Sequence, residues 1–137
     1  RVAIDISDIY IDRENFGKAL RWSDKAINLI DNSGKGYGQK GKVYYKGWET
    51  YKQNPLSVDD RIVAKLAYKN FLKAEKLNYR GFSRSKYLNE NAKDLLYGKE
   101  QWFMAEDKVK RSGTIRTTTS SYDWVTDELA SEKGWKK

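Results

Sequence analysis

The segment from Gly36 to Val43 has the residue types of a phosphate-binding loop. Its sequence, Gly-Tyr-Gly-Gln-Lys-Gly-Lys-Val, fits the spacing G-x-G-x-x-G and most of the P-loop pattern G-x-x-x-x-G-K-[S/T]. Glycines let backbone N–H groups approach a phosphate, and lysines supply positive charge. However, the segment follows a predicted helix rather than a strand, and Val43 lacks the hydroxyl that would hold magnesium. We therefore predict no nucleotide binding here, but a helix in which Gly38 and Gly41 admit neighbouring helices.

Two pairs of neighbouring carboxylates are weak candidates for acid–base catalysis. Asp59 is followed by Asp60, and Glu106 by Asp107. Adjacent residues on a helix point about 100° apart, so neither pair converges, and capping or solvated charge explains both. The chain has no histidine and no cysteine, which excludes Ser-His and Cys-His catalysts, disulfides and the usual zinc ligands. We predict no enzymatic activity, no cofactor and no metal site.

The net charge of +8 over 137 residues is concentrated in the middle of the chain. Residues 37–80 carry ten basic and four acidic side chains, whereas residues 1–36 and 113–137 are each balanced. Basic side chains interleaved with tyrosines can bind nucleic acid or another polyanion. That function is the alternative hypothesis, and it requires these lysines to gather on one surface.

The elements that carry these residues are predicted to be helices. Apolar positions recur at helical spacing, and polar or glycine-containing breaks separate the segments. The expected helices cover residues 2–11, 15–31, 37–53, 58–77, 84–97 and 100–111, and a last helix follows Ser120 and runs through Lys133. Ser57-x-x-Asp60 is a candidate capping box for the fourth helix, and Ser120-x-x-Asp123 for the last one. Residues 112–121 are expected to be an irregular linker, with an edge strand as the less favoured option.

Alanines spaced seven residues apart predict that the helices pair as hairpins. Ala19 and Ala26, and again Ala67 and Ala74, lie almost two helical turns apart and therefore on one face. A small residue there lets a second helix approach closely. We expect a helical repeat domain over residues 1–112, with hairpins at about 2–31, 36–78 and 84–111. Residues 113–137 would form the linker and a C-terminal tail helix, packed on the domain or partly flexible.

This pattern resembles the tetratricopeptide repeat. Matching residues in the first hairpin are Ala3, Ile6, Ser7, Tyr10, Phe16, Ala19, Ser23 and Ala26, and in the second Gly41, Tyr44, Ala67, Phe71 and Ala74. The second hairpin has 23 residues from Tyr44 to Ala67, where the first has nine from Tyr10 to Ala19, so its helices are expected to be longer. The resemblance implies an all-α fold: a stack of antiparallel helix hairpins in an α-α superhelix.

The resemblance also implies a concave groove lined by the first helix of each hairpin. The matching positions are Ile4, Asp8, Ile11, Gly38, Lys42 and Tyr45, with Lys46 on the same face. We expect these residues to be exposed, with Ile4 and Ile11 contacting an apolar side chain of a peptide and Lys42 a carboxylate. Ordinary surface is the other interpretation. Family members that clamp a terminal carboxylate use Lys and Asn where this chain has Ile4 and Asp8, so that clamp is not implied.

These observations predict a non-catalytic protein–protein interaction module, a scaffold or adaptor. Its partner would be a peptide segment or a partner domain, bound at Ile4, Asp8, Ile11, Lys42, Tyr45 and Lys46. We expect no membrane span and no signal peptide, because no apolar run approaches 18 residues. The chain begins at Arg1 rather than Met, so we expect it to be part of a longer protein.

Overall fold

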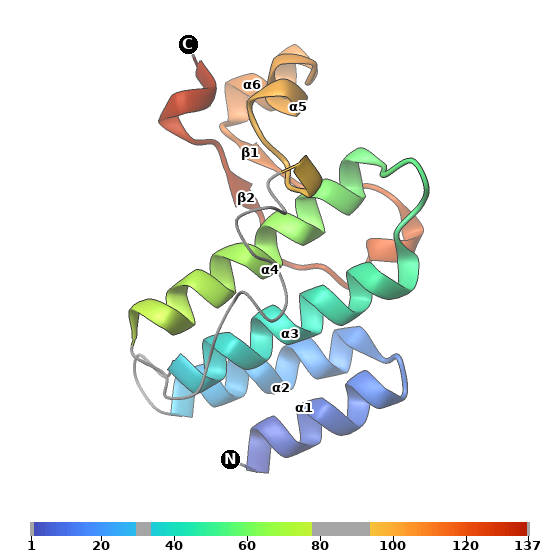
Figure 1. Ribbon diagram of the computed structural model, residues 1–137, viewed down its shortest axis with the longest axis vertical. Helices are drawn as coiled ribbons and strands as arrows, with labels where there is room; N and C mark the ends of the chain where they lie inside the picture. The colour runs from blue at the N-terminus through green and yellow to red at the C-terminus, as the bar shows by residue number, and fades with distance from the viewer. Residues whose placement is uncertain (1, 30–33, 78–93, 137) are drawn as a thin grey trace.

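The computed structural model describes residues 2–29, 34–77 and 94–136, and four long helices dominate it (Figure 1). They are α1 (Val2–Asp12), α2 (Phe16–Leu29), α3 (Gly34–Tyr51) and α4 (Val58–Lys76). The predicted all-α character is confirmed. The rest of the described chain forms short elements: α5 (Lys99–Phe103), α6 (Asp107–Ser112), β1 (Thr114–Ile115), β2 (Leu129–Ala130) and the 3₁₀ turns η3 (Ser120–Tyr122) and η4 (Lys133–Lys136).

The long helices form two antiparallel hairpins, α1 with α2 and α3 with α4 (Figure 1). Both helices of the first hairpin also contact α3, so the hairpins stack. The four alanines at seven-residue spacing are buried where the helices meet, as predicted: Ala19, Ala26, Ala67 and Ala74. Within the described ranges, no helix combines the length and apolar character needed to cross a lipid bilayer.

Local sequence explains where α4 begins after the turn of the second hairpin, and why its neighbours can approach α3 closely. Ser57 accepts a hydrogen bond from the N–H of Asp60, and Asp60 accepts one from the N–H of Ser57, which is the predicted capping box. The glycine-rich segment lies inside α3. A Cβ on Gly36 would lie 2.8 Å from the side chain of Ile27, and one on Gly41 2.6 Å from the ring of Phe71. These glycines therefore let α2 and α4 approach α3.

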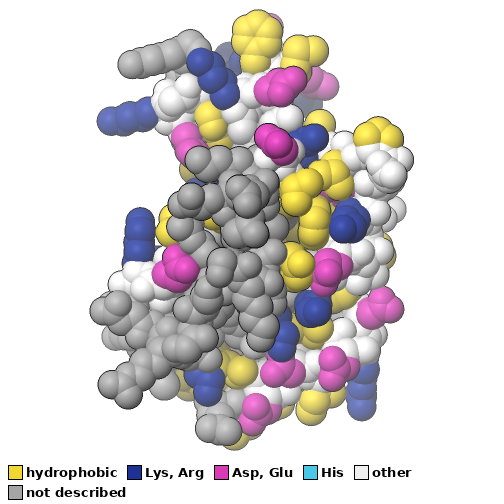
Figure 2. All heavy atoms as spheres, viewed as in Figure 1, with side chains coloured by type: hydrophobic (Ala, Val, Ile, Leu, Met, Phe, Trp, Pro, Cys, Tyr) yellow, Lys and Arg dark blue, Asp and Glu magenta, His cyan; other side chains and the backbone are white. Residues whose placement is uncertain are grey.

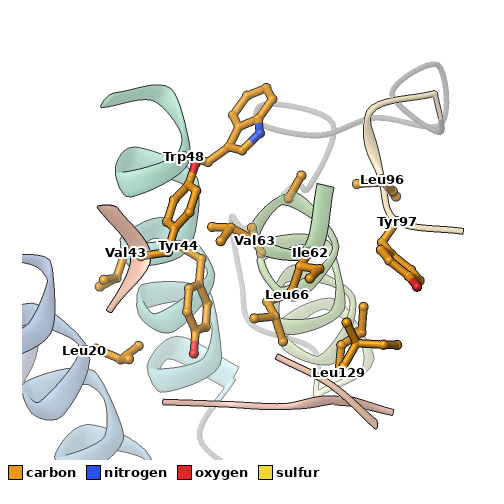
Figure 3. Close-up of a cluster of buried hydrophobic side chains, with 14 of the residues drawn as sticks. Leu20, Val43, Tyr44, Trp48, Ile62, Val63, Leu66, Leu96, Tyr97 and Leu129 are labelled. Atoms are coloured by element: carbon orange, nitrogen blue, oxygen red, sulfur yellow. The ribbon is translucent and has the colours of Figure 1, made fainter. Parts of the chain in front are cut away.

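The core lies between α3 and α4 and continues toward the C-terminal part of the chain (Figure 3). Tyr44 and Trp48, two aromatic residues of α3 that are one helical turn apart, are buried there. Leu129 in β2 adds a fully buried side chain beside α4. β2 pairs antiparallel with β1, with Thr114 opposite Ala130 and Ile115 opposite Leu129. The core thus includes residues of the region predicted to be a tail.

The expected third hairpin is not observed in the described residues. Residues 84–93 of its first helix lie outside them, and residues 94–97 are not α-helical. Its second helix is broken into α5 and α6, because only Trp102 of this segment is buried and Phe103 and Met104 face solvent. A continuous helix would have needed an apolar stripe along one face.

The predicted C-terminal tail helix is also wrong. Between β1 and β2 the chain makes one 3₁₀ turn, Ser120–Tyr122, and otherwise runs without helix along α2, α3 and α4. In Figure 1 it passes behind α3 and α4, from the turn that joins them back to β2. Side-chain contacts with three helices outweigh the local helix signal, as tertiary context often does.

Candidate functional site

Three of the six predicted site residues line one open cleft between the end of α1 and the outer side of α3. This open cleft has a volume of about 600 Å³ and is lined by Ile11, Asp12, Glu14, Phe16, Lys42, Lys46, Glu49 and Thr50. Ile11 and Phe16 are buried apolar residues at its base. Lys46 lies 3.5 Å from Glu49, so charges of both signs surround the apolar base.

A polar network joins Asp8 to the edge of this cleft. The carboxylate of Asp8 lies 3.0 Å from the ammonium of Lys42 and accepts a hydrogen bond of 2.9 Å from the amide of Gln39. The same amide group donates to the hydroxyl of Ser7, which donates to the carbonyl of Ala19. Asp8 and Lys42 are therefore held in place, with both side chains partly open to solvent.

Two predicted site residues are buried rather than exposed, and the side chain of a third packs away from the open cleft. Ile4 is only 9% exposed and Ile11 only 7%, because both contribute to packing between helices. Tyr45 is half-buried and packs on Trp48 and Phe71, away from the open cleft. A binding role for the six residues stays a prediction, but Ile4 and Tyr45 do not line the open cleft.

A second surface was not predicted: the face of α2, α3 and α4 that residues 116–129 cover. We call these residues the tail segment and the surface beneath them the covered face. Asp59 begins the contact. Its carboxylate accepts hydrogen bonds of 2.8 Å from the N–H groups of Thr118 and Thr119 and from the hydroxyl of Thr119. Asp59 is only 5% exposed, so these bonds form away from water.

Asp60 extends the same attachment. Besides the N–H groups of Ser57 and Gln53, it accepts a 2.6 Å hydrogen bond from the hydroxyl of Tyr122. Burial alone would raise the pKa of the Asp60 carboxyl, but these donors outweigh it and lower the pKa. Burial and the nearby carboxylate raise the pKa of Tyr122, which stays protonated and donates. One carboxylate therefore caps α4 and holds the tail segment.

Aromatic rings provide the apolar part of the attachment. Trp124 packs on Phe16 of α2 at a centroid distance of 5.3 Å and on Tyr44 of α3 at 5.9 Å. A Cβ on Gly47 would lie 2.5 Å from the indole of Trp124, so the absence of a side chain there makes room for the ring. Tyr122 is buried and meets Tyr51 edge to face.

Asp127 ends the attachment on α3. It accepts a hydrogen bond from the hydroxyl of Tyr44 and lies 3.0 Å from Lys40, which also lies 2.7 Å from Asp24 of α2. Burial lowers the pKa of Lys40, but the two carboxylates outweigh that effect and raise it. Desolvation first, and then the charge of Asp127, raise the pKa of Tyr44. The lysine is thus charged and the tyrosine protonated at neutral pH.

The open cleft and the covered face lie on opposite flanks of α3. Lys42, Lys46 and Glu49 face the cleft, whereas Lys40, Tyr44 and Gly47 face the tail segment. Residues 42 and 44 are about 200° apart around a helix. The pair Asp59-Asp60 was the sequence signal for the covered face. Asp60 takes part in the capping box of α4, but Asp59 does not, and its carboxylate bonds to the tail segment instead.

Several basic side chains of residues 37–80 are paired with carboxylates. Four lysines of this segment lie within 3.5 Å of carboxylates: Lys40, Lys42, Lys46 and Lys65. On the face shown in Figure 2, positive and negative side chains alternate over the long helices. In the part of the chain that the structure describes, no three acidic side chains are placed to hold a metal ion.

Comparison with known proteins gives this chain no relative: no protein-family model, no curated protein and no solved structure matches it.

Proposed function

We propose that this protein is a non-catalytic interaction module, a scaffold or adaptor, that binds a peptide segment or partner domain in the open cleft. In this proposal the hairpins α1–α2 and α3–α4 are tetratricopeptide-like repeats, and the cleft belongs to their groove. The observation that carries it is the meeting of Ile11, Lys42 and Lys46 around one cavity of about 600 Å³. That volume is typical of specific ligand sites.

The chemistry of the cleft indicates what it would bind. Its base of Ile11 and Phe16 suits one apolar side chain, and Lys42 and Lys46 at its rim suit an acidic neighbour of that side chain. Glu49 and Asp12 would select against a densely acidic ligand. The covered face supports the proposal, because it is a second surface of the same stack that holds an extended chain.

A peptide display library tests this function. We expect selection on the intact protein to enrich sequences with an apolar residue next to Asp or Glu. The variant K42E/K46E should weaken the enriched peptides at least about tenfold, equal to about 1.4 kcal/mol. The variant K108E/R111E, with the same charge change at exposed positions on α6, should bind as the wild type does. Equal loss in both variants, or no enrichment, would contradict the proposal.

Nucleic-acid or polyanion binding through residues 37–80 is the second candidate. Lys52 lies over Trp48 and Lys73 over Tyr37, which are basic and aromatic groups placed together. The carboxylate partners of four other lysines weigh against it. Affinity for a DNA duplex across a salt series separates the candidates, because phosphate binding falls steeply with salt and peptide binding only modestly.

A further inference from the structure

A pocket on the outer side of the first hairpin belongs to neither the open cleft nor the proposed function. It has a volume of about 440 Å³ and is lined by Tyr10 of α1 and by Lys18, Arg21, Trp22, Asp24, Lys25 and Asn28 of α2. The α2 positions 18, 21, 22, 25 and 28 recur every three or four residues, which places them along one side of the helix. The pocket therefore combines a row of cations with two aromatic rings.

The cations of this pocket are available to a ligand. Lys18, Arg21 and Lys25 are exposed, and none lies within 4.0 Å of a carboxylate in the described ranges. The one acidic lining residue is Asp24, which lies 2.7 Å from the ammonium of Lys40 and shares it with Asp127, so three cations face one partly compensated carboxylate. The pocket therefore favours an anion.

The two aromatic rings of the pocket indicate a second property of its ligand, a flat ring. The ammonium of Lys25 lies 4.6 Å from the ring centre of Trp22, and that of Lys18 lies 5.5 Å from the ring centre of Tyr10. Each ring thus has one face in contact with an ammonium. Trp22 also packs against the cluster of Ala3, Ile4 and Ala26, and its side chain is only partly buried. A flat ring that stacks on the indole displaces the Lys25 ammonium, which can then pair with a negative group on the ligand.

We propose that this pocket binds a nucleobase with its phosphate, as a free nucleotide or as part of a single strand. The base stacks on Trp22, the phosphate lies among Lys18, Arg21 and Lys25, and the amide of Asn28 offers a donor and an acceptor to the base edge. An acidic peptide would satisfy the cations but leave the rings unused. The pocket volume lies within the range of small-ligand sites.

Titration calorimetry of the intact protein tests this site with four probes: AMP, a thymidine decanucleotide, inorganic phosphate and polyglutamate. We expect AMP or the decanucleotide to bind at least about tenfold more tightly than phosphate and polyglutamate, because stacking adds to charge. Binding of AMP assigns a free nucleotide, and binding of the decanucleotide alone assigns a single strand. No binding, or equal binding of polyglutamate, would overturn the proposal.

Two variants locate the binding. K18Q/R21Q/K25Q should weaken the nucleotide probe at least about tenfold, whereas K99Q/K108Q/R111Q, which removes the same charge from exposed sites on α5 and α6, should stay within about twofold. Trp22→Leu keeps an apolar contact with Ala26 but removes the stacking surface, and should also weaken binding about tenfold. Equal losses in the two triple variants would show general charge attraction and refute the site. None of these substitutions touches the open cleft, so this test and the peptide test fail independently.

Discussion

The two flanks of α3 show how one helix can serve structure on one side and remain open on the other. On its covered flank, Tyr44 is buried and donates to Asp127 of the tail segment, and Lys40 pairs with the same carboxylate. At the open cleft, Asp8 and Lys42 pair with each other and keep part of their surface in water. Buried, bonded polar groups stabilise a fixed contact, whereas half-exposed pairs contribute little and can exchange partners.

The difference also shows how this helix stack can hold an extended chain. The covered face uses carboxylates that accept backbone N–H groups, as Asp59 does, and aromatic rings that accept an indole, as Phe16 and Tyr44 do. The open cleft has an apolar base and a charged rim, and among the described residues no segment lies across it as the tail segment lies across the covered face. Stability experiments should therefore respond at the covered face, and binding experiments at the open cleft.

The largest expected effect is loss of the indole that attaches the tail segment. Trp124→Ala should lower the free energy of unfolding in urea by about 2–3 kcal/mol. This loss is somewhat smaller than that for truncating a fully buried tryptophan, because the side chain of Trp124 is half-buried. Phe103→Ala is the matched control, since its ring is 74% exposed, and it should change stability by less than about 0.5 kcal/mol. Equal effects would remove the distinction between the covered face and ordinary surface.

Gly47, on the flank of α3 that faces the tail segment, allows a prediction of whether a substitution raises or lowers stability. Alanine is a better helix former than glycine by about 1 kcal/mol, but a Cβ on Gly47 would lie 2.5 Å from Trp124. Gly47→Ala should therefore lower stability by about 1–2 kcal/mol through overpacking. Thr50→Ala, on the cleft flank of the same helix, should be neutral or slightly stabilising. A more stable Gly47→Ala protein would mean that the indole does not lie on α3.

Acid should loosen the covered face through Asp60. Its folded-state pKa is lower than that of the unfolded chain, about 3.9, so its stabilisation is complete above that pH. The stabilisation is lost as the pH falls from about 4 through the lower folded-state pKa. Asp60→Asn should therefore lose less stability than the wild type between pH 5 and 3, measured by unfolding at each pH. Asp123→Asn, at an exposed carboxylate of the tail segment, should follow the wild type.

The smallest effect on stability is expected at the open cleft. Lys42→Gln and Lys46→Gln remove partly exposed ion pairs, which contribute about 0–1 kcal/mol each. Thermal unfolding of both variants should stay close to the wild type while their peptide binding falls. A loss as large as that of Trp124→Ala would show that the cleft lysines have a structural role instead.

Local signals in the sequence were sufficient for the four long helices. Alanine spacing predicted the buried contacts at Ala19 and Ala67, and the capping box of Ser57 and Asp60 predicted where α4 begins. The same reasoning failed for residues 113–137, because their structure depends on contacts with residues far away in the chain. Asp59 and Thr118, for example, are 59 residues apart.

Only part of the candidate site could be predicted, because the rest depends on how the helices pack against one another. Helical spacing correctly grouped Lys42 and Lys46 on one face of α3. The tetratricopeptide resemblance implied exposure of Ile4 and Ile11, whose burial depends on how closely α1 packs against its neighbours. Repeat position alone does not determine that distance, which small residues such as Ala26 set.

Hydrogen exchange of two backbone amides tests most directly whether the tail segment forms part of the folded core. The N–H groups of Thr118 and Thr119 both donate to the buried carboxylate of Asp59. They should exchange at least about tenfold more slowly than in an unstructured chain, and Asp59→Ala should abolish that protection while amides in the middle of α4 stay protected. Exchange of these two amides at unstructured rates in the wild-type protein would contradict the account.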